Sequence, residues 1–132
     1  MSELLGAPAT VDHVGVAHVD LAHPVAALLG GLPPGRAMPS GVRVARVGAL
    51  EVVAPDRPGS PVDRFLATRG SGLHHLALAV GAPLEEVRAR LAAAGVEAIG
   101  VIEPGSDGRR TLFLHPRTMG GVLVELVEDR AA

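Results

Sequence analysis

The chain carries one short pattern twice, and this repeat constrains its fold more than any other feature. The first copy is the run Asp12-His13-Val14-Gly15-Val16-Ala17, followed later by Leu50-Glu51-Val52-Val53. The second copy is His74-His75-Leu76-Ala77-Leu78-Ala79, followed later by Val124-Glu125-Leu126-Val127. Each copy opens with a histidine on an apolar, strand-like run and closes with a glutamate on another. Two imidazoles and two carboxylates around one point are a plausible ligand set for a divalent metal.

The repeat also decides which histidine of the adjacent pair takes part. Aligning the two opening strands places His75, and not His74, opposite His13. Since side chains alternate between the two faces of a strand, His74 is expected on the other face. The sequence therefore predicts His13, Glu51, His75 and Glu125 as metal ligands.

Composition limits the kinds of chemistry that the chain can support. The 132 residues include no cysteine, so a metal must be held by imidazole, carboxylate, carbonyl or water. These ligands favour Zn, Co, Mn, Ni or Mg. A formal charge of −2 and only two aromatic residues argue against a nucleic-acid partner. The absence of lysine excludes Schiff-base chemistry.

No segment of the chain predicts a membrane or secretory role. No apolar run approaches the roughly 18 to 20 residues that a membrane-spanning helix needs. The opening Met1-Ser2-Glu3-Leu4-Leu5 lacks the basic and apolar regions of a signal peptide. We therefore expect a cytoplasmic protein without a membrane partner.

The order of predicted elements gives an α+β chain built from two modules. Residues 1–10 are expected to be a loose tail, and 11–132 a single domain. Its modules span 11–55 and 73–128, and a Pro/Gly-rich linker with a short helix, 56–72, joins them. Each module reads as a strand, a helix and then two or three strands, which suggests a pseudo-symmetric pairing of sheets. Strands are expected at 11–18, 42–47, 49–54, 73–80, 97–102, 110–115 and 121–127, a loop or weak edge strand at 32–40, and helices at 21–29, 62–69 and 84–94.

The motifs of both modules resemble those of the vicinal oxygen chelate superfamily. The resemblance is carried by the opening strand at 11–17, the run Gly72-Leu73-His74-His75, and the segments Phe113-Leu114-His115-Pro116-Arg117 and Gly120-Gly121-Val122-Leu123-Val124-Glu125-Leu126. Within that superfamily these motifs are similar to the methylmalonyl-CoA epimerase family, over roughly residues 11–128. The resemblance implies two paired βαβββ modules that form a curved mixed sheet around a central metal cavity.

The resemblance also implies an activity. Epimerases of this family exchange the α proton of an acyl-CoA thioester through a metal-stabilised enolate, and they are expected to be homodimers. It implies His13, His75 and Glu125 as ligands, with Glu51 at the more variable fourth position. Glu125 and Glu51 would then act as the acid–base residues. Arg109, Arg110 and Arg117 are expected to contact the phosphates of the CoA.

Two departures from the family pattern bear on this activity. The first predicted helix is about one turn shorter than the family's. The family's acidic base just before the strand at 42–47 is absent, because no carboxylate occurs between Asp20 and Glu51. Two alternatives therefore stay open: another metalloenzyme on the same scaffold, such as a glyoxalase-I-like isomerase or lyase, and a non-catalytic protein that binds a small molecule, as resistance proteins of the superfamily do.

Overall fold

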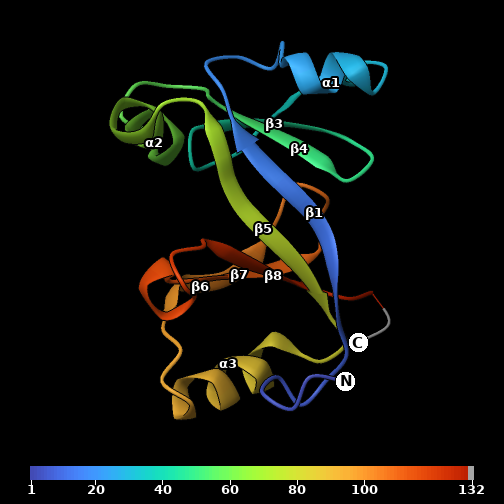
Figure 1. Ribbon diagram of the computed structural model, residues 1–132, viewed down its shortest axis with the longest axis vertical. Helices are drawn as coiled ribbons and strands as arrows, with labels where there is room; N and C mark the ends of the chain where they lie inside the picture. The colour runs from blue at the N-terminus through green and yellow to red at the C-terminus, as the bar shows by residue number, and fades with distance from the viewer. Residues whose placement is uncertain (131–132) are drawn as a thin grey trace. The chain divides into compact units, whose positions relative to one another are not determined.

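The structure is a computed structural model that describes residues 1–130, so the last two residues of the predicted domain, 131–132, lie outside the described part. The elements follow the predicted modular order (Figure 1). The first module contains β1 (Ala9–Ala17), α1 (Pro24–Leu28), β2 (Arg36–Ala37), β3 (Val42–Val47) and β4 (Leu50–Pro55). The helix α2 (Pro61–Arg69) follows. The second module contains β5 (Gly72–Val80), α3 (Leu84–Ala93), β6 (Ala98–Pro104), β7 (Arg110–Leu114), the 3₁₀ helix η1 (Pro116–Thr118) and β8 (Val124–Glu128).

Both modules are therefore βαβββ, with four strands in each, which confirms the predicted α+β class of two βαβββ modules. The chain divides into two compact units. The central unit is His13–His74, and the terminal unit combines Met1–Asp12 with the chain from His75 onward. Strands β1 and β5 each contribute residues to both units, so the division falls within these strands and not in the linker 56–72.

The central unit is a mixed sheet in the order β2-β3-β4-β1. Strands β3 and β4 form the predicted antiparallel hairpin, and β1 lies parallel to β4. The hairpin turns at Gly48, whose φ of +57° is a conformation that favours glycine. Alternation along the strands sends one set of apolar side chains to the α1 side of the sheet and another to the α2 side. The α1 cluster contains Val16, Ala26, Leu50 and Val52, and the α2 cluster contains Ala17, Val42, Val44, Val53 and Val62.

The first helix is shorter than the predicted 21–29, because Asp20 caps a turn and not the helix. The Asp20 carboxylate accepts a hydrogen bond from the backbone N–H of Ala22. The helix begins only at Pro24, where the ring nitrogen Nδ1 of His23 accepts from the N–H of Val25 at 3.1 Å. Proline suits the first helical position because it has no N–H to satisfy.

The helix α2 begins at a reciprocal cap. The buried hydroxyl of Ser60 accepts a hydrogen bond from the N–H of Asp63, and the Asp63 carboxylate accepts from the N–H of Gly59. Both bonds satisfy N–H groups at the helix start. The predicted helix 62–69 is thus confirmed within one residue, and it presents Val62, Phe65 and Leu66 to the α2 cluster of the sheet.

The terminal unit is a mixed sheet in the order β5-β8-β7-β6, with β5 and β8 parallel. One face of this sheet packs against α3, whose stripe of Leu84, Val87 and Leu91 is fully buried as the sequence predicts. Gly95, at φ +82°, follows the end of this helix, as expected for a glycine at a helix C-terminus.

The terminal segments differ from the sequence-based expectation. Leu5 and Ala7 of the predicted loose tail are buried in the core of the terminal unit, and Ser2 and Ala7 form a β-bridge. Apolar burial therefore holds this segment in place. Strand β1 begins at Ala9 and not at 11, and β8 begins at Val124 and not at 121. Among residues 1–130, none of the helices has the length and apolar character that crossing a bilayer requires.

Candidate metal centre

The central unit brings His13 and Glu51 together on the α2 face of its sheet. Gly15 lies opposite Glu51 in the parallel β1–β4 pair. His13, two residues before Gly15, therefore projects from the same face as Glu51. Both side chains are buried, and His13 Nε2 lies 3.5 Å from Glu51 Oε2. The predicted pair of the first module is thus a pair in space.

The terminal unit repeats this arrangement with His75 and Glu125. Ala77 lies opposite Glu125 in the parallel β5–β8 pair, so His75 projects from the same face as Glu125. Both are again buried, and His75 Nε2 lies 3.7 Å from Glu125 Oε1. The doubled sequence pattern therefore corresponds to a doubled three-dimensional motif.

The spacing of each pair fits metal ligands better than it fits a hydrogen bond. Hydrogen bonds between nitrogen and oxygen are generally about 2.7–3.2 Å long. Metal–ligand bonds of about 2.0–2.2 Å place neighbouring ligand atoms about 3–3.6 Å apart. The observed distances of 3.5 and 3.7 Å are close to that second range. A buried carboxylate needs a cation or several donors, which a divalent ion would supply. The buried side chains of His13, His75 and Glu125 are a donor set that could hold a metal ion.

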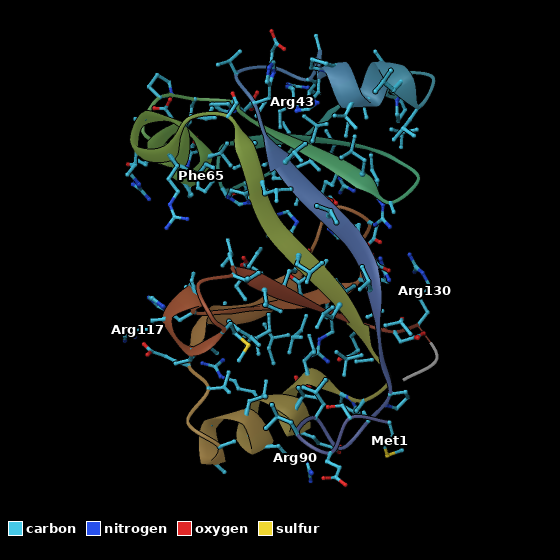
Figure 2. The ribbon with its side chains drawn as sticks, viewed as in Figure 1. Met1, Arg43, Phe65, Arg90, Arg117 and Arg130 are labelled. Atoms are coloured by element: carbon cyan, nitrogen blue, oxygen red, sulfur yellow. The ribbon has the colours of Figure 1, made fainter. Side chains whose placement is uncertain are left out.

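The neighbouring His74 has a different environment from His75. Its ring makes a T-shaped contact with Phe65, with ring centroids 4.8 Å apart. Phe65 projects from α2 (Figure 2) and belongs to the apolar α2 cluster. His75 instead contacts Phe113 edge-on at 6.1 Å, beside Glu125. These contacts support the choice of His75, and not His74, as the partner of Glu125.

Sequence reasoning missed Arg46, which lies directly opposite Glu51 in the β3–β4 hairpin. Its Nη1 lies 3.2 Å from His13 Nδ1, and its Nε donates to the carbonyl of Gly48 at 2.9 Å. The signal was present in the sequence: a turn at Gly48 and Ala49 pairs Arg46 with Glu51 automatically. The corresponding register position in the terminal unit, opposite Glu125, is Phe113.

Strand β3 carries no acidic residue on the α2 face. The residues that alternate onto this face are Val42, Val44 and Arg46. The residues just before this strand, 38–41, where the resemblance implies an acidic base, also carry no carboxylate.

The three arginines predicted to contact phosphate each pair with carboxylates within the terminal unit. Arg109 donates two hydrogen bonds to Asp12, at 2.9 and 2.8 Å, and one to Asp107 at 2.7 Å. Arg110 pairs with Glu85 and Glu128. Arg117 projects outward from η1 (Figure 2) and pairs with Glu97.

The electrostatic effects follow from these pairs. The Asp12 hydrogen bonds raise the pKa of Arg109 above its ordinary value, although burial opposes this. Burial alone would raise the pKa of Asp107, but the hydrogen bonds from Arg109 outweigh it and hold that pKa below its usual value. Arg109, 14% exposed, is thus fixed by two carboxylates, whereas the side chain of Arg117 is 65% exposed.

Comparison with known proteins places this fold and site in a recognised class. No protein-family model matches the chain. Methylmalonyl-CoA epimerase from Mycobacterium tuberculosis superposes with a TM-score of 0.81 at 31% identity, over 97% of this chain and 91% of that one. A variant of the Streptomyces coelicolor methylmalonyl-CoA epimerase, in complex with 2-nitronate-propionyl-CoA, gives 0.79 at 34% identity, over 92% and 94%. The fold is therefore that of the vicinal oxygen chelate superfamily.

Curated sequences agree with the structural comparison. The ethylmalonyl-CoA/methylmalonyl-CoA epimerase of Cereibacter sphaeroides is 40% identical over 80 residues, which is 58% of this chain and 59% of that protein. The chain spans about half the length of the curated relatives it matches, since the first three alignments cover 48–59% of their length. This chain belongs to the methylmalonyl-CoA epimerase family of that superfamily.

Proposed function

We propose that this chain is a metal-dependent epimerase of the methylmalonyl-CoA epimerase type, which exchanges the α proton of an acyl-CoA thioester. The observation that carries the proposal is the pair of buried His–Glu motifs, each at the spacing of neighbouring metal ligands. The complex of the Streptomyces coelicolor relative with 2-nitronate-propionyl-CoA supports an acyl-CoA as the substrate class.

The two motifs together would provide one ligand set, His13, Glu51, His75 and Glu125, for one divalent ion. Two neutral imidazoles and two carboxylates suit Co, Mn, Zn, Ni or Mg, and the donor set does not choose among them. A bound divalent cation would supply Lewis-acid stabilisation of the negative oxygen that develops on the thioester. The ligand side chains are buried, and a water-poor environment strengthens that interaction.

Glu51 and Glu125 would move the proton. A carboxylate takes the α proton, the electron pair of the broken C–H bond forms the enolate, and a carboxylic acid returns a proton to the opposite face. A carboxylate has two oxygens, so it can face the cation with one and the substrate carbon with the other. Strand β3 presents only valines and Arg46 on the α2 face, so it supplies no carboxylate that could take up a proton. Glu51 and Glu125 are therefore the residues best suited to act as acid and base.

The CoA portion would be held by cationic side chains at the surface. Arg110 and Arg117 pair with partly exposed carboxylates, which phosphate can displace because exposed ion pairs are weak. Arg109 suits this role less well, since Asp12 and Asp107 already hold its guanidinium.

Exchange of solvent deuterium into methylmalonyl-CoA tests the proposal. The purified chain is incubated in D₂O with the substrate, with and without Co²⁺, and His13→Ala serves as the control. We expect exchange that depends on the metal and is lost in the variant. Metal binding without exchange would instead favour another isomerase or lyase of the superfamily. Absence of both would favour a non-catalytic small-molecule binder.

We also propose a homodimer located in the cytoplasm. Two exposed apolar side chains, Ile99 and Val101, lie on β6, the edge strand beside β7, and they support self-association because exposed apolar edge strands tend to be covered. Sedimentation velocity at micromolar concentration would test this assembly. A single monomeric species would contradict it.

A further inference from the structure

The chain contains two phenylalanines, and each makes an edge-on ring contact with one of the two adjacent histidines. The Phe65 and His74 rings have centroids 4.8 Å apart and an interplanar angle of 69°. The Phe113 and His75 rings have centroids 6.1 Å apart and an interplanar angle of 83°. His75 is the buried partner of Glu125, whereas His74 is not a predicted ligand. The chain therefore carries the same kind of contact once on a candidate metal ligand and once on its neighbour.

The position of Phe113 in the terminal unit relates it to both members of the second His–Glu pair. Phe113 lies on β7, directly opposite Glu125 of β8. Directly opposite residues of an antiparallel pair project from the same face of the sheet. Strand β8 lies between β7 and β5, so the Phe113 ring reaches across β8 to contact His75. The ring thus lies on the face that holds His75 and Glu125, beside both.

The His75 ring needs such a neighbour because its own torsion does not fix its plane. The χ2 torsion of a histidine has broad minima, so the imidazole can rotate about its bond to Cβ. That rotation changes where Nε2 points, and Nε2 lies 3.7 Å from Glu125 Oε1 in the observed orientation. Aromatic rings prefer edge-to-face or offset arrangements to a direct face-to-face one. The contact with Phe113 therefore opposes rotation of the His75 ring away from this orientation.

The first module places a residue of different chemistry at the same register position. Arg46 lies opposite Glu51 in the β3–β4 hairpin, and its Nη1 lies 3.2 Å from His13 Nδ1. In each module, then, the residue opposite the glutamate contacts the histidine of the same pair. The repeat in the sequence therefore extends from the two His–Glu pairs to a third position in each module.

We propose that Phe113 is a positioning residue of the metal centre, which holds the His75 ring so that Nε2 and the Glu125 carboxylate face one ion. The proposal rests on the proposed function for the presence of that ion. A phenyl ring has no atom that coordinates a divalent cation, so Phe113 acts only through His75. A ring that is already held in place loses less freedom when the ion binds, and this raises the affinity for the ion.

Co²⁺ affinity, measured by competition with a chromophoric chelator, tests the role in Phe113→Leu and Phe113→Tyr. Phe65→Leu is the matched control, because it removes the corresponding ring from His74. Phe113 is only half-buried, so the fold should tolerate both substitutions. We expect Phe113→Leu to bind Co²⁺ about 3- to 10-fold more weakly, which corresponds to the contribution of one aromatic pair. Phe113→Tyr keeps the ring and should keep the affinity, and Phe65→Leu should bind Co²⁺ as the wild type does.

The visible absorption of bound Co²⁺ separates positioning from a general effect on stability. Its bands depend on the arrangement of the ligands, so they should shift in Phe113→Leu and not in Phe65→Leu. Equal losses of affinity in both leucine variants, or wild-type affinity in Phe113→Leu, would overturn the role. If Co²⁺ binding depends on Phe113 but methylmalonyl-CoA exchanges no deuterium, the proposed function fails and the positioning role stands. If the wild type binds no Co²⁺, both fail.

Discussion

Removing the side chain of Arg109 should destabilise the fold far more than removing that of Arg117. Both arginines bind a carboxylate through two nitrogens, Arg109 to Asp12 and Arg117 to Glu97. They differ in burial, since the side chains of Arg109 and Asp12 are each 14% exposed whereas those of Arg117 and Glu97 are 65% and 47% exposed. Burial should decide the energetic difference.

The magnitude follows from this difference. Removing one partner of a fully buried pair costs about 3–5 kcal/mol, and the partial exposure here reduces that to about 2–4 kcal/mol for Arg109→Ala. The variant also loses the hydrogen bond to Asp107. Exposed pairs contribute at most about 1 kcal/mol, which is the upper limit for Arg117→Ala. For a chain of this size, the Arg109 variant should melt roughly 8–15 °C lower.

Urea denaturation of the metal-free protein, followed by circular dichroism, measures both variants. The metal-free form is used so that ligand binding does not mask the change. Equal losses for Arg109→Ala and Arg117→Ala would refute the argument from burial. A loss below about 0.5 kcal/mol for Arg109→Ala would show that the contact with Asp12 contributes no stability.

Three further predictions concern acid sensitivity, the core and the metal. The pKa of Asp107 is lowered in the folded state. The charged carboxylate therefore stabilises the fold at pH values above its unfolded pKa of about 3.9. That stabilisation is lost as the pH falls through the lower pKa of the folded state. The stability difference between wild type and Asp107→Asn should therefore narrow between pH 7 and pH 3 in urea titrations; a constant difference would contradict it. Leu84→Ala should cost about 2–5 kcal/mol in the same assay, because Leu84 belongs to α3 and is fully buried in the core of the terminal unit; a change within 0.5 kcal/mol, about the scatter of surface substitutions, would be inconsistent with that packing. Saturating Co²⁺ should raise the melting temperature of the wild type but not of His75→Ala, and an equal rise in both would exclude His75 as a ligand.

The repeated pattern was enough to predict both His–Glu pairs, because each depends on local alternation within strands. Period-2 geometry keeps His13 and His75 on a defined face, and the parallel register with β4 and β8 brings each glutamate to it. The helix α3 was equally predictable from its stripe of leucine and valine and from the glycine that follows it.

The features that the sequence did not predict depend on a choice between two nearby capping residues or on contacts between residues far apart in the chain. Asp20 and His23 each accept a hydrogen bond from the backbone N–H two residues further on, but only His23 does so at the start of α1. The sequence of residues 1–10 suggests a loose tail, but Leu5 and Ala7 are buried against apolar residues of the second module. Arg46 was missed because its place beside the site follows from the hairpin register, which pairs it with Glu51 across the turn at Gly48 and Ala49.

The number of metal ions bound per chain tests the central claim most directly. Equilibrium dialysis against Co²⁺, with the metal quantified by mass spectrometry, would be performed on the wild type, His13→Ala and His75→Ala. If the two motifs form one site, the wild type binds one ion per chain and each variant loses it. Two ions per chain, or full retention in either variant, would contradict a single shared site.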